Sequence, residues 1–320
     1  MSKLSGVMQK AAVVKGRLTS DNTKYMAMKW RRKSKDIVLG LCVAVILLGT
    51  SYIIITPILG VISNTFMDYE DLANPMIFLI PETFTLENVS IAFELMGYIP
   101  TLITTLIFAF GLALIHVFIG AMVGYGFARF RIPGKSILFA LLIATIVMPT
   151  QSYILPMAVR FRDFFGMNII GTYIPWILIT LTGVGLRSGL FIFIFRQFFR
   201  GLPREIEEAA LIDGAGIFRT FTKVMLPNAL PPIITVLLFA FVWHYNDTFY
   251  SSMLMPGNDL MAFSLHQIEY IATFTMDVTF AFIRLLMYAG VFLAITPVLL
   301  IYFLLQRHFI EGIERSGIVG

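Results

Sequence analysis

Long apolar stretches alternate with short polar segments along most of this chain. A helix that crosses a bilayer needs about 20 mainly apolar residues, and six stretches reach that length. They span residues 37–63, 99–128, 136–158, 173–199, 229–256 and 284–305. The pattern predicts an all-α, polytopic membrane protein with six transmembrane helices, joined outside by two longer polar loops at 64–98 and 257–283.

The composition supports the same class of protein. Hydrophobic residues make up 58% of the chain and charged residues only 13%, whereas soluble domains average about 45–50% apolar residues. The net charge of +5 does not indicate nucleic-acid binding, because the basic residues lie beside the apolar stretches. The single cysteine, Cys42, excludes a disulfide framework within the chain.

The distribution of basic residues predicts the orientation. With the basic amino-terminal tail in the cytoplasm, the inner side holds every lysine and arginine of the 24 except Arg160, Arg162, Arg187 and Arg284, as the positive-inside rule requires. Both termini are then cytoplasmic. We expect a basic tail at 1–35 that is not a cleaved signal peptide, a transmembrane domain at 36–310 and a cytoplasmic tail at 311–320.

A polar insert at 201–228 interrupts the apolar pattern on the cytoplasmic side. Pro203 can open a helix, and the glutamates that follow complement the positive end of its dipole. Gly214 and Gly216 flank a predicted turn, and a second short helix is expected at 217–225, ending before Pro227. The insert therefore predicts a helix-turn-helix that lies along the membrane face.

The spacing of residues in this insert resembles the coupling loop of ABC importer permeases. The family pattern is Glu-Ala-Ala, three residues, Gly, nine residues and Ile-x-Leu-Pro, and this chain departs from it only by Val at the Ile position. The matching positions are Glu208, Ala209, Ala210, Gly214, Val224, Leu226 and Pro227. By resemblance, these residues couple the permease to an ATPase subunit.

Other stretches are similar to the carbohydrate-type permeases related to the maltose permease subunit MalG. They are Met148-Pro149-Thr150-Gln151, Phe195-Arg196-Gln197-Phe198-Phe199, the segment from Trp243 to Asp247, and Gln306 to Gly312. The resemblance covers most of the chain from about residue 99 onward.

The resemblance implies a multi-pass subunit of a bacterial cell-membrane importer. The expected partners are a second homologous permease, an ATPase dimer, an extracellular solute-binding protein, a carbohydrate substrate and the lipid bilayer, with no nucleic acid. The substrate would cross by alternating access. ATP and Mg would bind to the partner ATPase, and this chain would carry no catalytic residue, cofactor or metal. Gly134-Lys135-Ser136 does not complete a phosphate-binding loop, because the required first glycine is replaced by Arg129.

The predicted coupling helices carry an apolar ridge. Ile206, Ala209 and Ala210 share one side of the first helix, while Phe218, Phe221 and Met225 share one side of the second. We expect the ridge to face the ATPase. The alternative is a hairpin that packs only on its own transmembrane helices.

Polar residues within the apolar stretches are candidates for the translocation path. Arg187 and Asp247 both fall near mid-membrane, where a charge costs at least about 2.5–3.5 kcal/mol unless it is paired or hydrated. We hypothesise that they pair or face a common water-filled cavity. A spacing of three to four residues would place Ala240, His244, Asp247 and Ser251 on one helix face. The path candidates are Arg187, Trp243, His244, Tyr245, Asn246 and Asp247, with the aromatic rings available to stack on a sugar.

Two glycine pairs, Gly120 with Gly124 and Gly185 with Gly189, predict close helix packing rather than chemistry. Two other functions remain open besides sugar import. The solute can be something other than a sugar, or the chain can be an ion-coupled secondary transporter, which would have no use for a coupling loop. A membrane enzyme is disfavoured because no paired carboxylates, histidine cluster or nucleophile has workable spacing.

Overall fold

A computed structural model describes the backbone of residues 2–77, 79–276 and 278–317, and the side chains of residues 29–30, 33–77, 79–276, 278–304 and 306. Helices account for nearly all regular structure in these ranges, where two isolated β-bridges join Met67 with Phe84 and Phe164 with Met167. The predicted all-α class is confirmed. The predicted tails at 1–35 and 311–320 lie mostly outside the described side chains, and their boundaries remain predictions.

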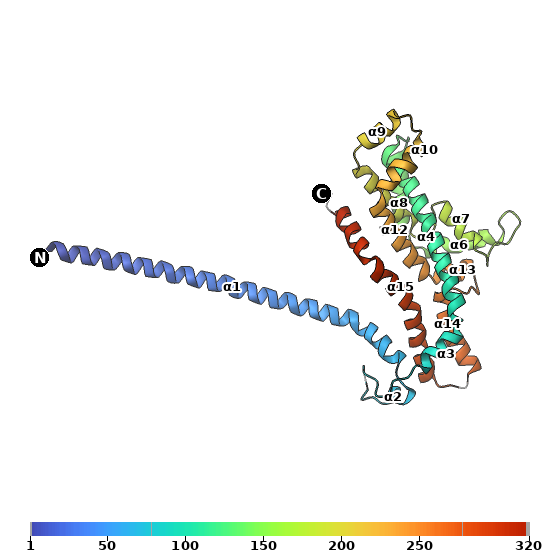
Figure 1. Ribbon diagram of the computed structural model, residues 1–320, viewed down its shortest axis with the longest axis horizontal. Helices are drawn as coiled ribbons and strands as arrows, with labels where there is room; N and C mark the ends of the chain where they lie inside the picture. Colours follow the sequence, from blue (N-terminus) through green and yellow to red (C-terminus); the bar gives the residue numbers. More distant parts are fainter. Residues whose placement is uncertain (1, 78, 277, 318–320) are drawn as a thin grey trace. The chain divides into compact units, whose positions relative to one another are not determined.

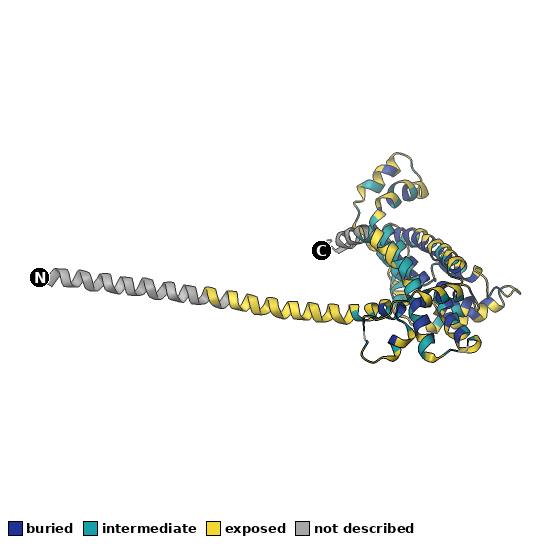
Figure 2. Ribbon diagram, turned by 60° about the horizontal axis from the view of Figure 1, so that its bottom comes forward, coloured by how far each residue is buried: buried dark blue, intermediate teal, exposed yellow. Residues whose placement is uncertain are grey.

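The chain divides into two compact units, Met1–Gly60 and Val61–Gly320. The first unit is the greater part of α1 (Ser2–Thr65). Its described side chains are almost all exposed, as Figure 2 shows for the yellow part of this helix. Apolar residues from Ile37 to Leu59 therefore lack partners within their own unit.

The second unit contains all the remaining helices (Figure 1). They are α2 (Tyr69–Ala73), α3 (Glu87–Leu95), α4 (Tyr98–Arg129), α5 (Lys135–Val147), α6 (Gln151–Arg162), α7 (Ile174–Leu181), α8 (Ser188–Gly201), α9 (Glu205–Ile212), α10 (Ile217–Thr220), the π-helix η1 (Phe221–Met225), α11 (Leu226–Asn228), α12 (Leu230–Tyr245), α13 (Phe249–Leu254), α14 (Met261–Thr275) and α15 (Phe280–Gly317).

Three of the predicted spans are continuous helices, and the other three are broken. Lys33–Thr65, Tyr98–Arg129 and Phe280–Leu304 are long and apolar enough to cross a membrane. The third prediction is divided into α5 and α6, which meet at 97°. The break follows from Pro149, because the residue before a proline is disfavoured in the helical conformation, and Met148 is extended with ψ 128°.

The fourth and fifth spans were predicted as continuous helices, and this was wrong. Residues 182–187 separate α7 from α8, and Arg187 adopts a left-handed conformation with φ 60° that no right-handed helix continues through. In the fifth span α12 ends at Tyr245 and α13 starts at Phe249. Two bent pairs can each be counted as one span, namely α5 with α6 and Ile217–Asn228 with Leu230–Tyr245, which meet at 81°. This raises the number of candidate spans from three to five, so the count of six remains a prediction.

Helix α4 forms the centre of the second unit. It packs closely on α8 and α12, and its glycines permit the approach. A Cβ atom added at Gly124 would lie 2.7 Å from Phe195 Cβ and 2.9 Å from the backbone nitrogen of Arg196. Gly189 on α8 is as closely approached by Thr145 of α5. The predicted close packing is confirmed for Gly120, Gly124 and Gly189, whereas Gly185 lies in the break between α7 and α8 rather than within a helix.

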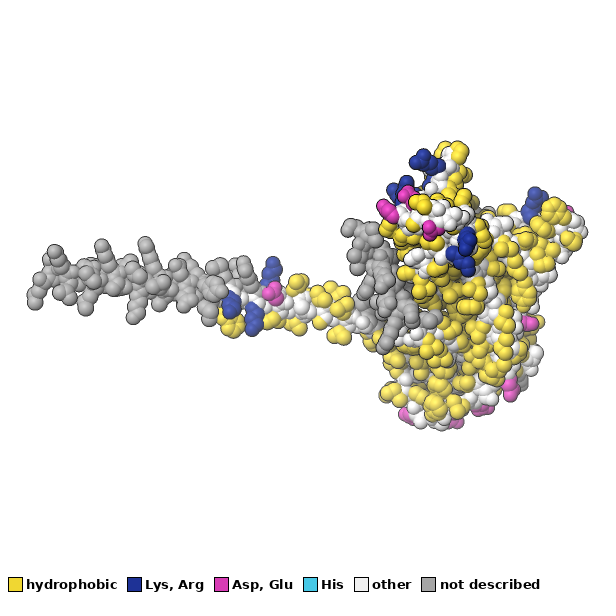
Figure 3. Space-filling model, turned by 45° about the horizontal axis from the view of Figure 1, so that its top comes forward, with side chains coloured by type: hydrophobic (Ala, Val, Ile, Leu, Met, Phe, Trp, Pro, Cys, Tyr) yellow, Lys and Arg dark blue, Asp and Glu magenta, His cyan; other side chains and the backbone are white. Residues whose placement is uncertain are grey.

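The two outer segments contain helices that the predicted loops did not include. Residues 64–98 hold α2 and α3, and residues 257–283 hold α14, which contacts α15, α4 and α3. In Figure 1, α3 and α14 lie at one end of α4, and α9 and α10 lie at the other. The sides of this unit are covered by hydrophobic side chains, and charged side chains gather towards its ends (Figure 3).

Candidate functional site

We call residues 201–228 the coupling segment, and they fold as the predicted helix-turn-helix. Helix α9 has Glu205, Glu207 and Glu208 in its first turn, and Gly214 turns the chain with φ 79°, a conformation that favours glycine. The second helix was predicted to end before Pro227, and this was wrong. It passes through η1 into α11, where Pro227 occupies one of the first two positions, which require no proline N–H.

The predicted apolar ridge is divided between two faces. Ala210, Phe221 and Met225 are buried against the chain's own helices. Ile212, Ile217 and Phe218 are 85%, 60% and 65% exposed. The interpretation of one ridge was wrong, because a helix packed on a bundle turns one of its apolar sides inward. We call Ile212, Ile217 and Phe218 the exposed apolar patch.

The inner face of the segment is fixed to the end of α4 by charged and polar contacts. Glu207 Oε2 lies 3.3 Å from Arg129 Nε, and the Tyr125 hydroxyl donates a hydrogen bond to Glu207 Oε1 at 2.5 Å. Arg129 Nη2 also donates to the Leu202 carbonyl at 2.8 Å. These contacts could not be predicted from the sequence, since the residues that α4 contributes lie more than 70 positions from their partners along the chain.

The charged path candidates do not form the ion pair that was hypothesised. The Arg187 guanidinium carbon lies 5.5 Å from the centre of the Trp243 ring, and no described carboxylate pairs with it. Asp247 accepts hydrogen bonds from the backbone N–H groups of Tyr250 at 3.3 Å and Ser251 at 2.8 Å, and from the Ser251 hydroxyl at 3.0 Å. The carboxylate therefore holds the first turn of α13.

The polar stripe predicted on the fifth span is also wrong, because α12 ends before Asp247. His244 is 1% exposed, and its ring stacks on that of His116 with centroids 5.0 Å apart. Trp176 approaches His244 edge-on at 5.2 Å. His116 Nδ1 is 3.4 Å from the Ser188 hydroxyl. The pair joins α4 and α12 at the start of α8 and lies inside the protein rather than on a path surface.

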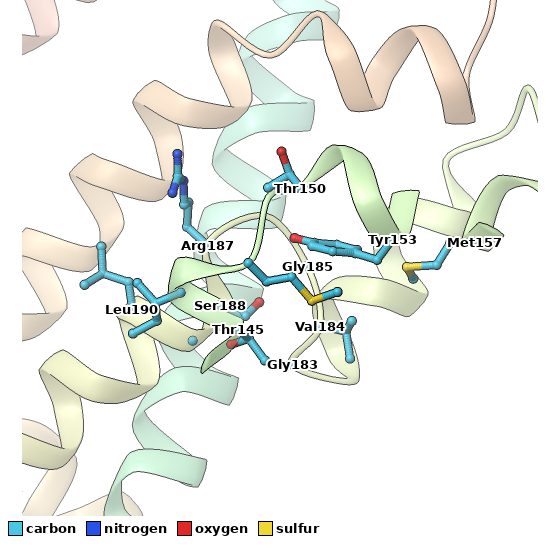
Figure 4. A pocket seen from close by; sticks show the side chains of 13 residues that line it. Thr145, Thr150, Tyr153, Met157, Gly183, Val184, Gly185, Arg187, Ser188 and Leu190 are labelled. Carbon is cyan, nitrogen blue, oxygen red and sulfur yellow. The ribbon is translucent and has the colours of Figure 1, made fainter. Parts of the chain in front are cut away.

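Two pockets include some of the path candidates. A pocket of about 250 Å³ lies at the break between α5 and α6 and the break before α8, and its lining includes Arg187, Ser188, Thr150 and Tyr153. Figure 4 shows Leu190 and Arg187 on one side of this view and Tyr153 and Met157 on the other. The Tyr153 hydroxyl accepts a hydrogen bond from Tyr250 at 2.6 Å. Tyr153 was missed, although the nearby Pro149 marks the break that exposes it.

The second pocket, of about 260 Å³, is lined by Tyr245 and Asn246 together with His266 of α14. Trp243, His244 and Asp247 line neither pocket. No group of three or more His, Cys, Asp or Glu side chains that could hold a metal ion occurs in the part of the chain that the structure describes. The first pocket offers hydroxyl groups, the Tyr153 ring and the Arg187 guanidinium, and the second offers the Asn246 amide with the Tyr245 and His266 rings. A few polar groups of this kind in a mainly apolar lining suit a polar ligand.

The chain is similar in sequence to known transport proteins. The chain is 28% identical over 267 residues to the diacetylchitobiose uptake system permease protein NgcG of Streptomyces coelicolor, covering 83% of this chain and 84% of that protein. It is 27% identical to the maltodextrin transport system permease protein MdxG of Bacillus subtilis, covering 88% and 96%.

A solved structure has the same fold. It is the crystal structure of a bacterial ABC transporter involved in the import of the acidic polysaccharide alginate, which matches with a TM-score of 0.67 at 20% identity over 86% of this chain and 98% of that chain. Residues 117–315 match the family model described as the binding-protein-dependent transport system inner membrane component. This match spans more than half of the chain, which therefore belongs to that family of multi-pass inner-membrane transport subunits.

Proposed function

We propose that this chain is a permease subunit of an ATP-driven importer for a sugar or oligosaccharide. With a second, homologous permease it forms the membrane pathway, and an extracellular binding protein delivers the substrate. The names of the similar diacetylchitobiose and maltodextrin permeases support a carbohydrate as the substrate. The coupling segment supports transport driven by ATP, because an ion-coupled transporter would not need such a segment.

The exposed apolar patch is the observation that supports an ATPase partner. Large apolar side chains on a charged, water-facing segment indicate a binding surface. Glu208, Ala209 and Gly214 adjoin this patch in the sequence motif, and Glu208 and Ala209 are both exposed. ATP and Mg bind to the partner ATPase in this proposal, and this chain transmits the movement of that subunit to its helices.

The pockets beside the broken helices are the proposed sugar contacts of this subunit. Arg187 and Ser188 lie where α8 begins, and Thr150 lies where α6 begins. Unwound backbone at membrane depth is tolerated where it faces protein or water, and transporters place their sites at such discontinuous helices. Tyr245 and Asn246 contribute to the second pocket. Trp243 and His244 do not line these pockets and instead pack against neighbouring aromatic rings.

The test is co-purification of the partners with tagged full-length chain in mild detergent. We expect wild type to retain a second permease and an ATPase. Phe218→Asp should lower ATPase recovery by at least about tenfold, because truncating an interface anchor typically costs about 2 kcal/mol or more. Gly214→Asp should act in the same direction by straining the turn. Phe274→Asp is the matched control, since Phe274 is 72% exposed on α14, away from the coupling segment.

Recovery of a homogeneous protein without an ATPase would contradict the proposal. Uptake that collapses with the ion gradient but survives ATP depletion would point instead to a secondary transporter. In either case, competition between a labelled sugar and other solutes for uptake would identify the substrate class.

A further inference from the structure

The end of α4 contacts the coupling segment at a point that the chain's connectivity does not require. Helix α9 is joined covalently to α8 through residues 202–204, and through α10 to α12. Helix α4 has no such connection to it. Its contacts are the side chains of Tyr125 and Arg129, which both engage Glu207.

These three groups are secluded from water. Tyr125 is 3% exposed, and the side chains of Arg129 and Glu207 are 6% and 16% exposed. Among the residues whose side chains the structure describes, Arg129 and Glu207 form the one ion pair. Because a secluded charge that loses its partner is strongly destabilised, α9 cannot leave the end of α4 without a large cost.

Arg129 also restrains the backbone that leads into α9. Its Nη2 donates to the Leu202 carbonyl at 2.8 Å, where α8 has just ended. The Tyr125 ring lies 5.6 Å from the Phe199 ring of α8 and 5.3 Å from the Phe221 ring of η1. Tyr125 and Arg129 therefore contact α9 and η1 of the coupling segment as well as α8, the helix that precedes it.

Close packing joins this end of α4 to the rest of the bundle. Gly124 lies one residue before Tyr125, where α4 approaches α8 closely, and the same helix packs on α12. Tightly packed elements of this kind shift as bodies rather than deform. The geometry points to Tyr125, Glu207 and Arg129 as positioning residues that make α4 move together with α9. This inference rests on the proposed function and specifies how ATPase movement reaches the pathway.

The test uses the complete transporter, purified with its ATPase, second permease and binding protein and reconstituted in vesicles. Glu207→Gln removes the charge but keeps the size of the side chain, and Tyr125→Phe removes one hydroxyl. Glu205→Gln is the matched control, because Glu205 lies in the same helical turn and is exposed. Uptake and ATP hydrolysis are measured on the same vesicles.

We expect Glu207→Gln to retain the ATPase subunit and its basal hydrolysis, while the sugar imported per ATP falls by at least about fivefold, the lower end of the coupling typical between sites. Tyr125→Phe should give a smaller loss, and the double variant should lose less than the two single losses combined. Glu205→Gln should match wild type.

A normal ratio of uptake to hydrolysis in Glu207→Gln would overturn the inference. Loss of the ATPase from this variant would overturn it as well, since Glu207 would then only support the docking surface. Failure of wild type to retain an ATPase would refute the proposed function itself, so the two failures are distinct. Should Glu207→Gln fold poorly, Tyr125→Phe alone decides, and unchanged coupling in that variant contradicts the proposal.

Discussion

Gly124 shows how one missing side chain sets the distance between two helices. Its position on α4 leaves no space for a Cβ atom beside Phe195 and the backbone of α8. Small residues at helix contacts permit this approach in membranes, where packing rather than water exclusion drives association. The spacing from Gly120 predicted this contact from the sequence, because the i and i+4 positions share a helix face.

Gly124→Ala should lower the stability of the bundle by about 1–3 kcal/mol, the usual cost of overpacking. The matched control is Gly126→Ala, where the nearest atom to an added Cβ is the Phe130 ring at 3.8 Å. Thermal unfolding in detergent measures both variants. An equal midpoint for the two would mean that α8 moves away at little cost.

Arg187 is the charged residue in the lining of the first pocket. It stands beside Trp243 without a described carboxylate partner. Its environment could not be predicted from the sequence, because the hydrophobic pattern around it does not reveal that the backbone breaks there.

Arg187→Gln should lower uptake by about tenfold or more at an unchanged amount of protein in the membrane, because hydrogen bonds to charged groups contribute about 1.5–3 kcal/mol. Arg162→Gln provides the control, since it makes the same change on an exposed residue of α6 outside the pocket. Radiolabelled sugar uptake is the measurement, and equal uptake by both variants would remove Arg187 from the pathway.

At the scale of elements, three of the predicted spans proved to be broken. Hydropathy reports the composition of a segment and not its backbone, so 173–199 and 229–256 were indistinguishable from continuous helices. The break before α6 was partly visible in Pro149. The other two breaks carry local signals that hydropathy does not register. Gly183 turns the chain before α8 with φ 72°, and Asp247 accepts hydrogen bonds from N–H groups in the first turn of α13, as a helix N-cap does.

Asp247 provides a test of whether the last of these breaks matters through structure or through charge. Asp247→Asn keeps an acceptor oxygen for the N–H groups of Tyr250 and Ser251, whereas Asp247→Ala removes it at a typical cost of about 1 kcal/mol for a lost helix cap. We expect the asparagine variant to retain most of the uptake and the alanine variant to lose both uptake and thermal stability. If both variants were inactive but stable, the carboxylate charge itself would be required.

For the whole molecule, the opposite placement of the coupling segment and the outer helices agrees with the predicted orientation. α9 and α10 lie at one end of α4, and α3 and α14 lie at the other (Figure 1). The apolar pattern was sufficient to predict the all-α fold class, and the motif was sufficient to predict a helix-turn-helix at 201–228; the coupling role of its residues remains a prediction. Neither pattern was sufficient for the inner face of that segment, because its contact with Tyr125 and Arg129 exists only after the chain has folded.

Site-specific labelling can check the orientation directly. Cys42 is the only cysteine of the chain, so Cys42→Ser gives a background free of thiols. In that background a membrane-impermeant maleimide should label Tyr270→Cys in intact cells, and Ile212→Cys only after the membrane is opened. Both parent residues are exposed, at 66% and 85%. Labelling of Ile212→Cys in intact cells would contradict the predicted topology, because it would place the coupling segment outside the cell.

The apolar side chains of α1 from Ile37 to Leu59 lack packing partners within their own unit, Met1–Gly60, unlike the buried apolar side chains of the second unit. Packing inside the first unit therefore contributes little to holding the helix. Partitioning of these side chains into lipid favours insertion, because each central Leu, Ile or Val contributes about 0.3–0.6 kcal/mol. Insertion of this helix into lipid and packing of the helices within the second unit thus draw on different free energies.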